Sequence, residues 1–138
     1  MIKIAPSILS ANLSNLKNEV IIIDQAGADY IHIDIMDGNY VPNTAFGPST
    51  VKTLRSITNK ILDVHLMISP VLKNIEEYAE AGADIISFHP EADPEPLKII
   101  NLIRSLNCKP GIAIHPNLTI NEIEKYLSLV DSVIVMTV

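Results

Sequence analysis

The sequence has little cysteine, little glycine and no long uninterrupted apolar run. One cysteine, Cys108, stands among the 138 residues, so no internal disulfide can form, and we expect a reducing, cytoplasmic setting. Only 5 residues are glycine, which argues against a disordered segment. No stretch approaches the roughly 20 apolar residues of a membrane helix, and residues 1–7 do not resemble a secretion signal. We therefore expect a soluble protein without a membrane partner.

Charge of neither sign is gathered into a block. The chain carries 16 acidic and 10 basic residues, for a net charge of -6 at pH 7. A basic footprint for nucleic acid is therefore not expected, and the expected partner is a small molecule. Hydrophobic residues make up 48% of the chain, enough to build one core, so we expect one domain over residues 1–138.

Short runs rich in β-branched residues alternate with segments of helical periodicity. Helical segments of about three turns are expected to begin near Asn12, Pro70, Pro94 and Thr119. Regular alternation of strands and helices is typical of a parallel α/β sheet. The six expected strands are residues 2–4, 30–35, 61–66, 84–88, 110–114 and 132–136.

A short repeat marks two junctions between a helix and the following strand. Residues 26–29 and 81–84 both read Ala-Gly-Ala-Asp, at an offset of 55 residues, and a weaker echo begins at Asp131. Half of this offset, about 27 residues, fits one strand and helix of a (β/α)8 barrel or a doubly wound sheet. The repeat indicates an internal duplication or the ordinary preference of helix ends for glycine and strand starts for isoleucine.

Polar and apolar side chains alternate in the second and third expected strands. His32 and Asp34 share one face of the second strand, and Asp63 and His65 share one face of the third. Strands of an open parallel sheet are apolar on both faces, whereas the end of a barrel interior holds catalytic residues. We therefore favour a TIM (β/α)8 barrel, incomplete in this chain at about six βα units and ending before strands seven and eight.

His32, Asp34 and His65 are candidate metal ligands. A buried polar group without a partner costs roughly 1–3 kcal/mol, so each of these side chains needs one. Imidazole and carboxylate are ordinary ligands of zinc, iron and manganese. The spacing fits equally well a structural His–Asp pair bonded to each other or to buried water.

Several sequence blocks resemble the ribulose-phosphate 3-epimerase family, in the same order and over the whole chain. Asn39 and Tyr40 depart from the family, which often has His and Phe there, and His115 stands where Asn or another polar residue is usual. The matching blocks are residues 5–11 (APSILSA), 32–38 (HIDIMDG), 41–43 (VPN), 46–48 (FGP), 63–67 (DVHLM), 88–92 (FHPEA) and 135–138 (VMTV).

The resemblance implies an isomerase of the pentose phosphate pathway that interconverts D-ribulose 5-phosphate and D-xylulose 5-phosphate at carbon 3. It implies a bound divalent metal cation (zinc, iron, manganese or cobalt), which can stabilise the enediolate formed by proton removal. Asp34 is implied as an acid/base group and a ligand, and His32 and His65 as further ligands. Ser7 and His65 are implied as substrate contacts. The resemblance implies that Met36, Met67 and Met136 give the intermediate a polarizable surface, and core filling is the alternative explanation for these residues.

The family's second acid/base aspartate follows strand seven, and its phosphate-binding turns follow strands six, seven and eight. We therefore expect this chain alone to be a poor catalyst, and we expect the open edges of the sheet to produce a homo-oligomer. Two alternatives stay open, namely a related ketose-phosphate 3-epimerase, such as one for allulose 6-phosphate, and a noncatalytic barrel fragment. The segment from Asp37 through Pro48 is expected to be a closing loop or a plain connection. No ligand role is expected for His89 or His115.

Overall fold

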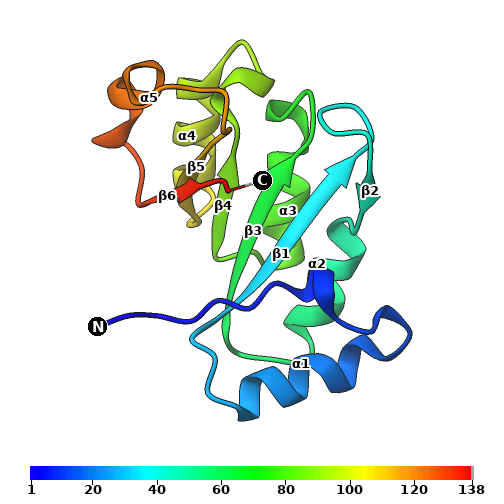
Figure 1. Cartoon of the computed structure of the whole chain (residues 1–138). Helices are drawn as coiled ribbons and strands as arrows, with labels where there is room; N and C mark the ends of the chain where they lie inside the picture. The colour runs from blue at the N-terminus through cyan, green and yellow to red at the C-terminus, as the bar shows by residue number, and fades with distance from the viewer. Residues whose placement is uncertain (138) are drawn as a thin grey trace.

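The sheet that organises the chain has six strands in the order β2-β1-β3-β4-β5-β6 (Figure 1). A computed structural model describes residues 1–137. The strands are β1 (Tyr30–Asp37), β2 (Thr44–Ala45), β3 (Ile61–Met67), β4 (Ile85–Phe88), β5 (Lys109–Ile114) and β6 (Ser132–Val135). The α-helices are α1 (Leu16–Gln25), α2 (Pro48–Arg55), α3 (Ile75–Ala81), α4 (Pro96–Ser105) and α5 (Ile120–Leu127). Short 3-10 helices are η1 (Ile8–Ser10), η2 (Leu13–Asn15), η3 (Leu72–Asn74) and η4 (Pro90–Ala92).

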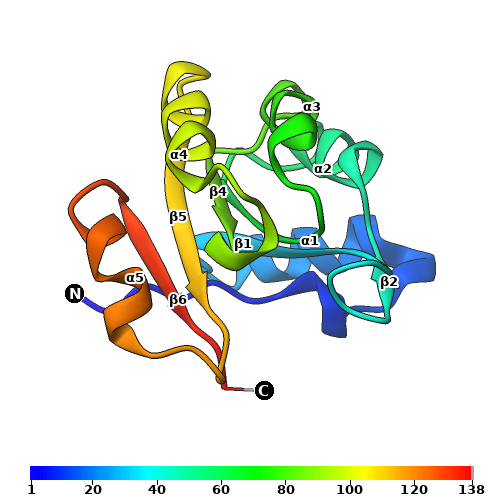
Figure 2. The same ribbon diagram turned by 90° about the horizontal axis from the view of Figure 1, so that it is seen from above.

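The expected α/β architecture is confirmed. Strands β1, β3, β4, β5 and β6 run parallel, and the two-residue β2 pairs antiparallel with the end of β1. Helices α2, α3 and α4 follow one another along the outer side of the curved sheet (Figure 2). This arrangement is that of a partial TIM barrel. No helix within residues 1–137 combines the length and hydropathy that a membrane crossing requires.

The prediction of a regular strand at residues 2–4 is wrong. This segment runs beside β1, where the Ile4 carbonyl accepts from the amides of Asp29 and Tyr30 at 2.9 and 3.1 Å. A single bridge then joins Ser7 and His32. Within the described residues the segment has a strand on one side only, and Pro6 has no amide hydrogen to extend a ladder. Ile2 and Ile4 consequently remain exposed.

Helix α2 and strand β2 were not among the expected elements. Gly47 is the N-cap of α2 and Pro48 occupies its first turn, where the missing amide hydrogen has no cost. Only Val51 and Leu54 of this short helix are buried, so its apolar periodicity is too brief to recognise. Helices α3 and α5 have 7 and 8 residues, which is less than the three turns expected.

The repeated Ala-Gly-Ala-Asp sequence forms the same junction twice. The Asp29 amide donates to the Ile4 carbonyl, and the Ile4 amide donates to Asp29 Oδ2 at 2.9 Å. Asp84 forms the same reciprocal pair with Leu62 on β3, at 3.0 and 2.8 Å. At the weaker echo, the Asp131 amide donates to the Pro110 carbonyl, but proline has no amide hydrogen for the reverse bond. Each of these aspartates therefore fastens the start of one strand to its neighbour.

The two faces of β1 have different surroundings, which places the polar residues away from the helices. Ile31, Ile33 and Ile35 are at most 1% exposed and belong to the core cluster. His32 and Asp34 alternate with them and therefore occupy the opposite, inner face of the sheet.

Candidate metal and acid/base site

The parallel register of β1 and β3 places the candidate residues side by side. His32 is opposite Asp63, Asp34 is opposite His65, and two residues later Met36 is opposite Met67. Because these positions are two residues apart, all their side chains share the inner face of the sheet.

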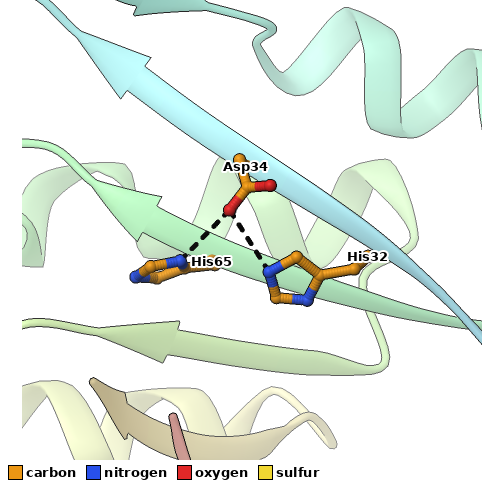
Figure 3. A group of neighbouring side chains, drawn as sticks. All are labelled: His32, Asp34 and His65. Atoms are coloured by element: carbon orange, nitrogen blue, oxygen red, sulfur yellow. Dashed lines mark hydrogen bonds and ion pairs between the residues drawn. The ribbon is translucent and has the colours of Figure 1, made fainter. Parts of the chain in front are cut away.

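Asp34 is at the centre of the cluster shown in Figure 3. Its Oδ1 lies 3.2 Å from His32 Nε2 and 3.3 Å from His65 Nδ1. Its other oxygen, Oδ2, accepts a 2.5 Å hydrogen bond from Ser7 Oγ. The structure thus brings together four residues expected at the site, from the N-terminal segment, β1 and β3.

His32 is held in place by a second carboxylate. Its Nδ1 lies 2.8 Å from Asp63 Oδ2, while its Nε2 faces Asp34. With a metal bound, Nδ1 would donate its hydrogen to Asp63, and the lone pair on Nε2 would face the cluster. A carboxylate behind a histidine in this way fixes the ring orientation and makes the ligand more basic.

Burial and hydrogen bonding have opposite effects on the pKa of Asp34. Burial favours the neutral acid, but hydrogen bonds from His32, His65 and Ser7 hold the pKa of Asp34 well below its usual range. Asp34 is therefore a carboxylate at neutral pH.

The two histidines differ in charge because their surroundings differ. Burial lowers the pKa of His32, but hydrogen bonds to Asp34 and Asp63 outweigh it and raise that pKa to about 9. The His65 side chain is 2% exposed, and burial lowers its pKa despite the bond to Asp34. His65 is thus neutral, in the form that can bind a metal.

The donor set fits a divalent cation. One atom from each of His32, Asp34 and His65 lies within 4.8 Å of the other two. Two nitrogens and a carboxylate oxygen form a ligand set suited to zinc, iron or manganese. The side chains of His32 and Asp34 keep 17% and 15% exposure, so the cluster is open to solvent on one side.

Two of the three candidate methionines lie beside the cluster, and the third lies on another part of the sheet. Met36 and Met67 follow directly on β1 and β3, and Met67 is 5% exposed. Met136 comes after β6, three strands from β3 in the sheet order, where its amide donates to the Ile114 carbonyl. A cleft of about 470 Å³ opens beside Met36 and is lined also by Leu9, Pro42, Asn43, Thr44 and Ala45.

His89 contacts the cluster, which the sequence did not predict. Its Nε2 lies 3.0 Å from His65 Nε2, and its side chain is fully buried. The signal that could have revealed this contact is a histidine directly after a strand that neighbours β3. His115 lies at the corresponding end of β5, but its Nδ1 accepts from the Asn117 amide instead.

The last residue of β1, Asp37, holds the start of the following loop and the segment after β3 through its carboxylate. Asp37 accepts hydrogen bonds from the amides of Asn39, Tyr40 and Ser69 at 2.8, 3.1 and 3.0 Å. Burial opposes ionisation, but these amides lower the pKa of Asp37. Farther along, the Tyr40 hydroxyl donates to Glu91 Oε1 at 2.6 Å, which joins this loop to η4.

Comparisons with solved structures agree with the fold. A Yersinia pestis dihydropteroate synthase with a pterine-sulfa conjugate matches with a TM-score of 0.62 at 14% identity, covering 91% of this chain and 50% of that one. Dihydropteroate synthase from Xanthomonas albilineans in complex with 7,8-dihydropteroate gives a TM-score of 0.62 at 13% identity, with the same coverage. At such low identity these TIM-barrel enzymes support the fold alone.

Comparisons of sequence are far more specific. A ribulose-phosphate 3-epimerase of Rhodobacter capsulatus is 47% identical over 137 residues, covering 99% of this chain and 60% of the relative. That of Bacillus subtilis is 46% identical over 138 residues, covering 100% and 64%. The chain therefore spans less than two thirds of the length of these relatives. The ribulose-phosphate 3 epimerase family matches residues 3–138, and the chain belongs to this family.

Proposed function

We propose that the whole protein is a metal-dependent epimerase that interconverts D-ribulose 5-phosphate and D-xylulose 5-phosphate at carbon 3. The observation that carries the proposal is the convergence of His32 Nε2, Asp34 Oδ1 and His65 Nδ1 on one point of the inner face. Family membership, with relatives named as this enzyme at 47% and 46% identity, supports the choice of reaction.

Asp34 is the proposed acid/base group. Its low pKa keeps it ionised, so it can accept the proton from carbon 3 and return it. His32, Asp34 and His65 would hold the divalent cation, which supplies electrophilic stabilisation of the charge that develops on the substrate oxygens. Ser7 bonds to the Asp34 oxygen that faces away from the histidines, so it orients the carboxylate and lies within reach of substrate.

Inversion of a carbon centre needs acid/base groups on both faces of a planar intermediate. Asp34 accounts for one face, and the group for the other face lies outside the described cluster. Met36 and Met67 continue the same inner face and would give the intermediate a polarizable, apolar surface. The proposal includes a sugar phosphate as the only small-molecule partner, the pentose phosphate pathway as the context and a cytoplasmic location.

Proton exchange at carbon 3 tests this proposal. D-ribulose 5-phosphate is incubated in D2O with the protein produced from its complete reading frame, and deuterium at carbon 3 and xylulose 5-phosphate are followed by NMR. Asp34→Asn should slow exchange by about 10²–10⁴-fold, because the acid/base group is lost. Turnover that survives Asp34→Asn unchanged would contradict the role of Asp34.

Two other outcomes decide between the alternatives. A higher kcat/KM for allulose 6-phosphate than for ribulose 5-phosphate would favour a related ketose-phosphate 3-epimerase. Metal binding without exchange on either substrate would favour a noncatalytic barrel.

A further inference from the structure

His89 is a buried histidine that the proposed reaction leaves without a role. It follows β4, its side chain is fully buried, and the Tyr40 ring lies against it with 4.7 Å between ring centroids. Its Nε2 lies 3.0 Å from Nε2 of His65. Two ring nitrogens at this distance form a hydrogen bond only when one carries a hydrogen and the other a lone pair.

The other nitrogen of His89 indicates which arrangement holds. His89 Nδ1 lies 3.4 Å from Glu91 Oε1, and among the described residues it has no hydrogen-bond partner. Burial opposes ionisation, but His89 and Tyr40 together lower the pKa of Glu91, so this group is a carboxylate at neutral pH. A lone pair on Nδ1 would face the carboxylate and be repelled, whereas an N–H would be attracted.

A hydrogen on His89 Nδ1 determines the state of the next ring. With its one hydrogen on Nδ1, His89 has a lone pair on Nε2 and accepts from His65, so His65 carries its hydrogen on Nε2. The lone pair of His65 is consequently on Nδ1, the atom 3.3 Å from Asp34 Oδ1. Two electron-rich atoms facing each other in this way need a cation between them.

We propose that His89, oriented by Glu91, is a positioning residue that selects, in the metal-loaded site, the His65 tautomer with its lone pair on Nδ1. The inference rests on the proposed metal site and adds to it a chain of groups running from Glu91 through His89 to His65. A carboxylate or carbonyl behind a metal-binding histidine is a general feature of metal sites, and here a second histidine is inserted between them.

Tyr40 adds a contact to this chain of groups. Its hydroxyl donates to the Glu91 oxygen that faces His89, at 2.6 Å, while its ring covers the His89 ring. A phenylalanine at this position would keep the ring contact but would leave Glu91 without the donor. Tyr40→Phe therefore removes the hydrogen bond that orients Glu91 but keeps the aromatic ring packed against His89.

Zinc affinity of the full 138-residue chain, measured by isothermal titration calorimetry, is the first readout. His89→Gln should weaken zinc binding by about 10–100-fold and Glu91→Gln by about 10-fold, because these groups orient a ligand. His115→Gln is the matched control, since this histidine directly follows the next strand, β5, and the substitution is expected to leave affinity within about twofold. If His89→Gln fails to fold, Glu91→Gln decides, because the Glu91 side chain is 33% exposed.

The tautomers themselves are the second readout and do not depend on activity. Long-range 1H–15N spectra of the zinc-loaded chain should show His65 protonated on Nε2 and His89 protonated on Nδ1. A hydrogen on His89 Nε2, or unchanged zinc affinity in both variants, would overturn the inference and leave the proposed metal site standing. Failure of the unsubstituted chain to bind zinc would overturn both the role of His89 and the proposed metal site.

Discussion

Asp34 shows how a single carboxylate can organise a site at the scale of one residue. Its two oxygens contact three side chains from separate segments of the chain, Ser7 before β1, His32 on β1 and His65 on β3. Without a cation, hydrogen bonds from these three side chains lower the pKa of Asp34, and His65 then carries its hydrogen on Nδ1. In the metal-loaded site proposed above, that hydrogen is on Nε2 instead. The same geometry allows a metal to take the place of the hydrogens between these groups.

Replacing Asp63 tests the support behind His32. Asp63→Asn keeps the size of the side chain but removes the charge 2.8 Å from His32 Nδ1, so zinc affinity should fall about 10-fold. Competition with a chromogenic chelator measures this change. Glu124→Gln makes the same charge change at an exposed position and is the control. An equal loss of zinc affinity in both variants would indicate a general electrostatic effect and contradict a specific role of Asp63.

The sequence predicts part of this site for a definite physical reason. His32 and Asp34 are two residues apart on one strand, and His65 follows on the next, so strand alternation alone places them on one face. The contact of His65 with His89 depends instead on how the chain turns after β4. Local periodicity carries no information about that turn, so the sequence assigns His89 no ligand role and does not predict its contact with His65.

At the scale of elements, buried carboxylates join segments that no strand ladder connects. Asp93 accepts from the amides of Val71 and Leu72 through Oδ2, and from the Glu95 amide through Oδ1, at 2.9 to 3.0 Å. It thereby ties the start of η3 to the start of α4. Burial acts against ionisation of Asp93, but the three amides lower its pKa.

Asp93→Asn should destabilise the chain by about 1–3 kcal/mol at pH 7, because a buried amide hydrogen loses its charged acceptor. Since the folded pKa is below the ordinary 3.8, the stabilising effect is present above that pH and is lost as the pH falls through the folded pKa. Urea unfolding at pH 7 and at pH 3 should therefore show a smaller difference between the two proteins at pH 3. A difference independent of pH would contradict this account.

Gly111 provides a test of packing on the inner face. A Cβ at this position of β5 would overlap the hydroxyls of Ser87 on β4 and Ser132 on β6. Gly111→Ala should consequently cost about 1–3 kcal/mol in the free energy of unfolding. Gly47→Ala is the control, since a Cβ there meets no atom within 4 Å, and an equal loss in both would disprove the packing explanation.

The elements differ in how well the sequence predicts them. Strands β1, β3, β4, β5 and β6 were expected within two residues of their observed ends, because their apolar positions are continuous or strictly alternating. Helix α2 and strand β2 were missed because they bury few residues and depend on the return of the chain from β1. Residues 2–4 have the composition of a strand but pair on one side only.

At the scale of the whole molecule, apolar side chains remain exposed at the ends of the described chain. Ile2 is 88% exposed and Ile4 is 57% exposed, and on β6 Val133 and Val135 are 38% and 71% exposed. Within residues 1–137, β6 has a neighbouring strand, β5, on one side only. Such an edge is a common site of association.

We therefore expect the 138-residue chain to self-associate as its concentration rises, in line with the homo-oligomer expected from the sequence. Val135→Lys should shift the average mass toward the monomer, because a charge on an edge strand opposes pairing. Size-exclusion chromatography with light scattering measures the mass. Leu97→Lys, at an exposed position of α4, is the control, and a monomer at all concentrations would contradict the expectation.

The central claim is that His32, Asp34 and His65 together bind one divalent metal ion. Zinc titration of the 138-residue chain, beside its His32→Ala/His65→Ala variant, tests this claim most directly. The account predicts a single saturable site that loses at least about 100-fold in affinity when two of its three ligands are removed. Absence of saturable binding, or equal affinity in the two proteins, would contradict it.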